Sequence, residues 1–200
     1  LSLGTANITA YVTNPVIVDS TQKLKNGGGS FDFAGGITLK SGSELVGQGQ
    51  EISGNISLSG GKLSIAQDTI FADNLAISAG STINIDALKT LTYDGATVGI
   101  GAAVLKIQGG GTFINTESTE LKLNSANSNL VLDNVTVAYV SVSAASNSNK
   151  GLQVTADSTL TNLSLTQKLR LSVAAEKTFS VTESLTVPTQ GMLLSGSGML

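Results

Sequence analysis

A short motif, in which two alternating apolar segments flank a polar bend, recurs along this chain. The stretch LAISAGSTINI, which begins at Leu75, aligns with LSVAAEKTFSV, which begins at Leu171. In both stretches apolar residues occupy every second position, small or polar residues follow, and the alternation then resumes. Because successive side chains of a β-strand point to opposite faces, each half of the motif predicts a short strand with one apolar face. The whole motif therefore predicts strand, bend, strand.

Copies of this motif extend across the whole chain. The copies that keep every apolar position are VIVDSTQKL at Val16, ITLKSGSEL at Ile37, LKIQGGGTF at Leu105, LQVTADSTL at Leu152 and LTVPTQGML at Leu185. Looser or partial copies begin at Leu1, Ile56, Leu91, Leu121 and Val140. A unit of roughly twenty residues that cannot bury its own apolar face is stabilised by stacking on its neighbours. We therefore expect residues 1–200 to form a single all-β domain, a parallel β-solenoid of about ten to twelve coils.

Other architectures fit the composition less well. Long helices are disfavoured because the chain contains 23 glycines and keeps no apolar stripe of helical period. A hairpin meander would need a tight-turn dipeptide at most repeats, and Asn26-Gly27 and Asp94-Gly95 are too few. A leucine-rich repeat is disfavoured because the recurring asparagines lie in strand positions, and a calcium-binding roll because GGGSFD at Gly27 occurs once and lacks the required spacing.

The first and last residues both lie at the edge of a motif copy. Leu1 begins one copy and Leu200 closely follows another, without an initiating Met or a signal peptide. We expect the chain to be a segment of a longer protein, whose neighbouring coils would cover the sheet edges at both ends.

The residue types present exclude several kinds of chemistry. The chain has no Cys and no His, which removes thiolate and imidazole metal sites and a Ser-His-Asp triad. The net charge of −3 and the scattered basic residues argue against nucleic-acid binding. No apolar run is long enough for a membrane helix. We predict no catalytic residue, no metal and no cofactor.

Carboxylates are the remaining candidates for catalysis, since a β-solenoid can place acidic residues of adjacent coils within the 5 to 9.5 Å that glycoside hydrolysis requires. Asp68 and Asp86 are 18 residues apart, close to one coil, and Asp73 lies in the same region. The favoured interpretation is that these are solvated carboxylates on turns. Arg170 in KLRLSV alternates with apolar residues, so we expect its side chain on the outer face near Lys168.

Further features predict structure rather than chemistry. One column of the motif contains threonines, namely Thr82, Thr112, Thr159 and Thr178, and is interrupted by Glu44 and Met192. Hydrogen bonds in turns and between coils explain this column better than an ice-binding face does. The sequons at Asn7, Asn55, Asn134 and Asn162 are as frequent as chance predicts in a chain so rich in Ser and Thr. Residues 23–36 and 143–151 are predicted to bulge out as loops, and Tyr93 occupies an apolar position and is predicted to be buried.

The motifs LAISAGSTINI, LQVTADSTLTN and LLSGSGML resemble repeats of large secreted bacterial β-helix proteins, namely autotransporter passenger domains and filamentous adhesins. The richness in Ser, Thr, Gly and Asn with low charge is also typical of exported surface chains. The resemblance implies a right-handed parallel β-helix at the cell surface or in the medium. It also implies a structural or adhesive role, with host-surface or matrix glycans or proteins as partners. The alternative is a carbohydrate-binding or carbohydrate-cleaving β-helix, including one like a phage tail spike.

Overall fold

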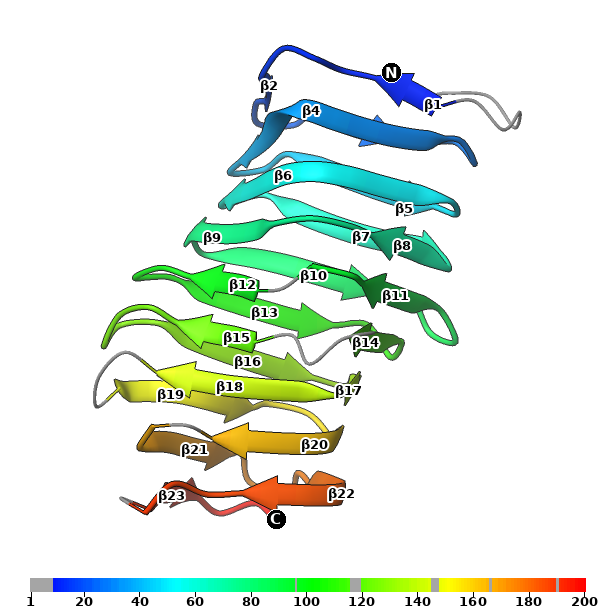
Figure 1. Cartoon of the computed structure of the whole chain (residues 1–200). Coiled ribbons are helices and arrows are strands. Elements are labelled where there is room, and N and C mark those ends of the chain that lie inside the picture. The colour runs from blue at the N-terminus through cyan, green and yellow to red at the C-terminus, as the bar shows by residue number, and fades with distance from the viewer. Residues whose placement is uncertain (1–8, 96, 116–119, 145–147, 166, 190) are drawn as a thin grey trace.

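The computed structural model describes residues 9–200 apart from 96, 116–119, 145–147, 166 and 190. The chain winds as a stack of coils with the N-terminal coil at one end and the C-terminal coil at the other (Figure 1). All strand pairings between coils are parallel, and they build two sheets that enclose a narrow interior. The motif copy at Leu1 and the sequon at Asn7 lie outside the described residues.

Two sheets run along the stack. In the described part of the chain, sheet A contains β3 (Lys23–Lys25), β5 (Glu44–Gln48), β7 (Lys62–Gln67), β10 (Ser81–Ile85), β13 (Val104–Gln108), β16 (Asn129–Asp133), β19 (Ser148–Val154), β21 (Leu169–Val173) and β23 (Leu193–Gly196). Over the same residues, sheet B contains β1 (Thr9–Tyr11), β2 (Val16–Val18), β4 (Ser30–Lys40), β6 (Glu51–Ser59), β8 (Thr69–Phe71), β9 (Leu75–Ala79), β11 (Thr90–Tyr93), β12 (Thr97–Ile100), β14 (Thr112–Asn115), β15 (Glu120–Leu123), β17 (Thr136–Ala138), β18 (Val140–Ala144), β20 (Ser158–Leu165) and β22 (Phe179–Thr186).

The solenoid has about eight turns in its described part, fewer than the ten to twelve predicted. The chain passes through sheet A once in each turn. Copies of the motif, in contrast, occur at more than one corner of a turn. LAISAGSTINI covers β9, a bend and β10, and so leads from sheet B to sheet A. LSVAAEKTFSV covers β21, a bend and β22, and so leads from sheet A to sheet B. Counting every copy as a coil therefore overestimated the number of coils.

Apolar side chains form continuous columns in the interior. One column takes a buried residue from each successive strand of sheet A: Leu45, Leu63, Ile83, Ile107, Leu132, Val154 and Val173. Each buried aliphatic side chain of this kind contributes about 1.5–3 kcal/mol through removal from water. The columns therefore fix the register of the coils, because a shift by one residue would turn every apolar side chain outward.

The aromatic residues form a small stack within the same interior. The rings of Phe71, Tyr93 and Phe113 are stacked, with centroids 5.7 Å apart for the first pair and 6.1 Å for the second. Tyr93 is fully buried, as predicted, and its hydroxyl donates a hydrogen bond to the carbonyl of Thr97 at 2.9 Å. Burial raises the pKa of Tyr93 to about 12, because the phenolate would lose its hydration.

The region predicted to bulge at residues 23–36 is instead largely strand. It contains β3 and the start of β4, so that only residues 26–29 lie outside strands. The side chain of Asn26 explains how this corner stays tight. Its Oδ1 accepts a hydrogen bond from the Gln48 amide at 2.7 Å, and its Nδ2 donates to the Gly49 carbonyl on the next coil. Of the second predicted loop, 143–151, residues 145–147 lie outside the described residues.

Glycine is required at the corner after β13, where the backbone lies very close to the preceding coil. Gly109 has a φ of 114°, and a Cβ atom added there would lie 2.3 Å from the carbonyl oxygen of Ile85. We predict that Gly109→Ala lowers the free energy of unfolding by at least about 2 kcal/mol, through backbone strain and this clash. Urea denaturation followed by far-UV circular dichroism measures the change.

The matched control is Gly80→Ala, since a Cβ at Gly80 meets no atom within 4 Å and its φ lies outside the left-handed region. This control should stay within about 1 kcal/mol of the wild type. Equal destabilisation by both substitutions would contradict the packing described for the corner at Gly109.

Candidate functional site

The predicted pair Asp68 and Asp86 lies in consecutive turns that lead from sheet A to sheet B, and both residues are exposed. Asp68 Oδ1 accepts a hydrogen bond from the Thr90 amide of the next coil at 2.8 Å. Asp86 Oδ1 accepts a hydrogen bond from Asn84 Nδ2 at 2.9 Å. The structure thus places the pair on one edge of the stack, where Asp68 helps to join two coils.

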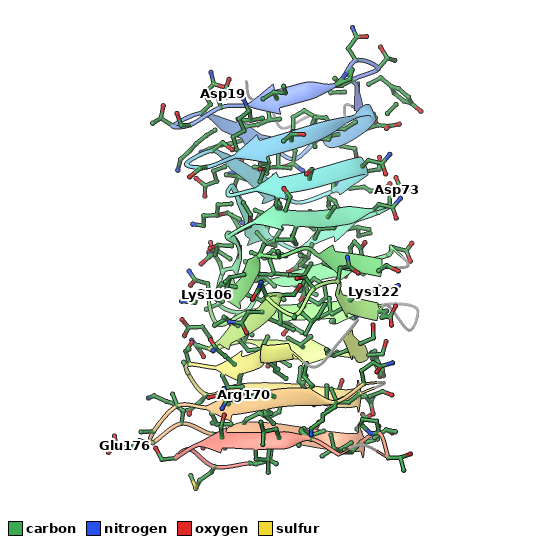
Figure 2. All side chains as sticks on the ribbon, turned by 90° about the vertical axis from the view of Figure 1, so that its left-hand side faces the viewer. Asp19, Asp73, Lys106, Lys122, Arg170 and Glu176 are labelled. Atoms are coloured by element: carbon green, nitrogen blue, oxygen red, sulfur yellow. The ribbon has the colours of Figure 1, made fainter. Side chains whose placement is uncertain are left out.

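Two further aspartates make the same type of contact between coils. Asp157 Oδ1 accepts a hydrogen bond from the Thr178 amide at 2.8 Å, and Asp73 Oδ2 accepts one from the Gly54 amide at 2.8 Å. Asp73 lies at the bend between β8 and β9, a different corner from that of Asp68, and its side chain is at the outer edge in Figure 2. A carboxylate that accepts an amide hydrogen bond satisfies a donor that the turn leaves unpaired. These contacts assign a structural role to Asp68, Asp73 and Asp157.

Serine hydroxyls at the corners also form hydrogen bonds with the backbone. Ser43 donates to the carbonyl of Lys40, Ser81 to that of Ala79, and Ser158 to that of Ala156, at 2.7 to 2.9 Å. All three serines are buried, and each hydroxyl finds its acceptor within the chain. The polar bend of the motif is thus explained by local hydrogen bonding.

A row of charges crosses the outer face of sheet A at its N-terminal end. Glu44 pairs with Lys23 on one neighbouring strand at 2.5 Å and with Lys62 on the other at 3.5 Å, and it accepts a hydrogen bond from Ser64 at 2.5 Å. Partial burial tends to raise the pKa of Glu44, but Lys23, Ser64 and Lys62 outweigh burial and hold that pKa below its ordinary value of 4.5. The row is therefore a cross-strand ion-pair network.

Other charged side chains are distributed around the stack. Lys40 pairs with Asp19 at 2.9 Å, and Lys106 pairs with Asp133 across adjacent strands of sheet A. Figure 2 shows Asp19 and Lys106 on one side of the stack and Asp73 and Lys122 on the other. Arg170 lies on β21 between buried Leu169 and Leu171 and is partly exposed, in agreement with the predicted outward position.

The predicted threonine column is only partly correct. Register pairs place Thr112 and Thr159 in one outer column of sheet B, whereas Thr82 pairs with Lys62 and Lys106 on sheet A, and Thr178 precedes β22. The complete column, which we name the hydroxyl ladder, consists of Thr90, Thr112, Thr136, Thr159 and Ser180. Glu44 lies on sheet A and Met192 precedes β23, so neither interrupts it.

The sequence motif missed three of these five residues because the ladder is defined by pairing between coils. Thr90, Thr136 and Ser180 occupy different positions relative to the bends, and the coils differ in length. The neighbouring column contains Thr92, Ile114 and Ala138, so the regular Thr-x-Thr pattern of an ice-binding face is still not met. The ladder is thus a single row of hydroxyls beside mixed small and apolar residues.

A polar cleft borders the C-terminal half of the hydroxyl ladder. Its lining includes Thr136, Thr159 and Ser180 from the ladder and Asn134 and Asp157 from the adjoining turns. Two other hollows are more apolar: one lies over β2, β4, β6 and β9, and the other over β22 and the C-terminal residues. Neither Asp68 nor Asp86 lines any of these three hollows.

Within the described residues, no group of three or more Asp, Glu, His or Cys side chains is arranged to hold a metal ion. The same residues include no helix with the length and apolar character needed to cross a membrane. No family model, curated protein or solved structure matches the chain.

We predict that Asp68→Ala lowers the free energy of unfolding by about 1 kcal/mol, because the Thr90 amide loses its acceptor. Thermal or urea unfolding measures the loss. Glu51→Ala is a suitable control, since Glu51 is exposed and none of the described residues bonds to its side chain. A change within about 0.5 kcal/mol is expected for this control. An unchanged stability of Asp68→Ala would argue against its structural role.

The ion-pair network predicts a pH dependence of stability. Since the pKa of Glu44 is lower in the folded chain than its ordinary value of 4.5, its contribution is present above that pH and is lost as the pH falls below it. Glu44→Gln should therefore cost about 1 kcal/mol near pH 7, and the difference from wild type should shrink toward pH 3.

The comparison requires urea unfolding at several pH values, with Glu51→Gln as the control for removal of an exposed carboxylate. We expect the control to leave the pH profile close to that of the wild type. A constant difference between Glu44→Gln and wild type across the whole pH range would show that the ionised state of Glu44 does not stabilise the fold.

Proposed function

We propose that this chain is a stiff, non-catalytic rod of a secreted or cell-surface bacterial protein, and that it supports attachment or display. The observation that carries the proposal is the pairing of nearly every strand with the coil before and the coil after it. Such pairing resists bending and local opening, because any deformation has to break backbone hydrogen bonds in both sheets and expose the interior columns. A rod of this kind holds a binding surface away from the cell.

The positions of the polar groups agree with a structural role. Asp68, Asp73 and Asp157 contact amides of neighbouring coils, and the corner serines contact carbonyls. These contacts favour a scaffold over an enzyme. In an enzyme, general acids and bases face a shielded groove, whereas these side chains bond to the backbone. The resemblance to autotransporter passengers and filamentous adhesins implies right-handed winding and export. Both are part of the same proposal. Host-surface or matrix glycans and proteins are the proposed partners.

The alternative function is a carbohydrate-binding or carbohydrate-cleaving solenoid. The polar cleft beside Thr136, Thr159 and Ser180 favours binding, since it offers neutral hydrogen-bonding groups. Cleavage would need a second carboxylate facing Asp157 in the cleft, and Asp157 is the one acidic residue among its described lining residues.

An array of glycans and extracellular-matrix proteins separates these functions. Purified chain is applied to the array, retention is read by fluorescence, and released sugar fragments are read by mass spectrometry. We predict retention on at least one surface without release of fragments. Release of fragments would contradict the non-catalytic role, and absence of retention on every surface would contradict the adhesive role.

A further inference from the structure

The hydroxyls of the hydroxyl ladder differ from the buried serine hydroxyls at the corners in what they contact. The corner hydroxyls of Ser43, Ser81 and Ser158 are bonded to backbone carbonyls. Among the residues that the structure describes, none hydrogen-bonds to a side-chain hydroxyl of the five ladder residues. All five are partly exposed. The ladder therefore presents unused donors and acceptors to solvent.

These hydroxyls are regularly spaced along the rod. They lie on five strands that follow one another in sheet B, namely β11, β14, β17, β20 and β22. Neighbouring strands of a sheet are about 4.8 Å apart, which sets the repeat of the hydroxyls. That repeat is comparable with the length of one sugar unit in an extended polysaccharide chain. A linear polymer of sugars can thus meet one hydroxyl with each successive unit.

The polar cleft provides further groups at one edge of the ladder. Asn134 and Asp157 line it next to Thr136 and Thr159. Asp157 uses Oδ1 to accept the Thr178 amide, and within the described chain its Oδ2 has no bonded partner. Carboxylate and amide groups beside hydroxyls are suited to hydrogen bonding with vicinal sugar hydroxyls. The cleft and the ladder therefore form one continuous hydrogen-bonding surface.

The charge of this surface indicates the charge of its ligand. The ladder residues are uncharged, and so are Thr92, Ile114 and Ala138 in the neighbouring column. The one charge of the cleft is the carboxylate of Asp157, which disfavours anionic polymers such as uronates or sulfated glycans. No aromatic ring lines the cleft among its described residues, so stacking on a sugar ring is replaced by repeated hydrogen bonds.

We propose that the hydroxyl ladder and its cleft bind a neutral, linear polysaccharide that lies along the axis of the rod. The inference rests on the proposed adhesive function and names the ligand class for it. Each hydrogen bond contributes little in water, but a rigid sheet presents the hydroxyls already ordered, and the contacts add along the chain. Binding should therefore strengthen with the length of the oligosaccharide.

The test uses β-1,4-linked oligosaccharides of glucose and of mannose, from disaccharide to hexasaccharide, added to isotope-labelled wild-type chain. Amide chemical shifts locate the site, and their titration gives the dissociation constant. We expect the shifts to gather at the ladder residues and the hexasaccharide to bind more tightly than the disaccharide. Absence of shifts with all of these sugars, or shifts confined to other faces, would overturn the proposal.

The double variant Thr136→Val/Thr159→Val removes two hydroxyls while keeping β-branched side chains of similar shape. Loss of two hydrogen bonds should weaken hexasaccharide binding by about tenfold. The matched control is Thr38→Val/Thr82→Val, which alters outward threonines of other columns. Both variants should keep the wild-type circular dichroism spectrum, and a folded ladder variant that binds as tightly as wild type would refute the role of the ladder.

The same variants on the array separate this inference from the adhesive function. Retention of the ladder variant at wild-type level would overturn the ladder proposal and leave the adhesive function intact. Loss of retention for the ladder variant but not for the control would support both. Failure of the wild type to be retained on any surface would instead contradict the adhesive function.

Discussion

Backbone pairing between successive coils is the interaction on which the rest of this structure depends. Because every coil is hydrogen-bonded in parallel to its neighbours, residues about twenty positions apart become spatial neighbours in fixed columns. The columns then determine which side chains meet. Apolar residues such as Leu63 and Ile83 meet inside, and Lys23, Glu44 and Lys62 meet outside. The core, the ion-pair network and the hydroxyl ladder are three consequences of one pairing scheme.

The polar residues separate into two groups by what they contact. Aspartates and serines at the corners satisfy amides and carbonyls that the turns leave unpaired, as Asp157 and Ser158 do. The hydroxyl-ladder residues at the start of sheet B strands have backbones that pair with neighbouring coils, so their hydroxyls are left for solvent or a ligand. Asp157 belongs to both groups, since its Oδ1 accepts a hydrogen bond from the Thr178 amide and its side chain also lines the cleft. A scaffold and a binding face thus arise from the same residue types at different places in a coil.

Much of the fold was predictable because the alternation of apolar residues is local. The solenoid class, the parallel strands and the burial of Tyr93 follow from positions that are close in sequence. The number of coils was overestimated because similar bends occur at two kinds of corner. The ladder could be found only in part, since pairing of Thr112 with Thr136 or of Thr159 with Ser180 depends on coil lengths that the motif does not encode. For the same reason, the motif does not encode the contacts of the Asn26 side chain with Gln48 and Gly49, which keep this corner tight.

The distance between labelled residues of a single outer column tests the rod most directly. Lys23 and Ser195 occupy the two ends of one column of sheet A, eight strand spacings apart, and the chain has no cysteine that would compete for a label. Double electron–electron resonance on the Lys23→Cys/Ser195→Cys variant with nitroxide labels measures their separation. A stiff stack predicts one narrow distribution centred at about 40 Å. A broad distribution, or a centre far from that value, would contradict the account of a continuous rod.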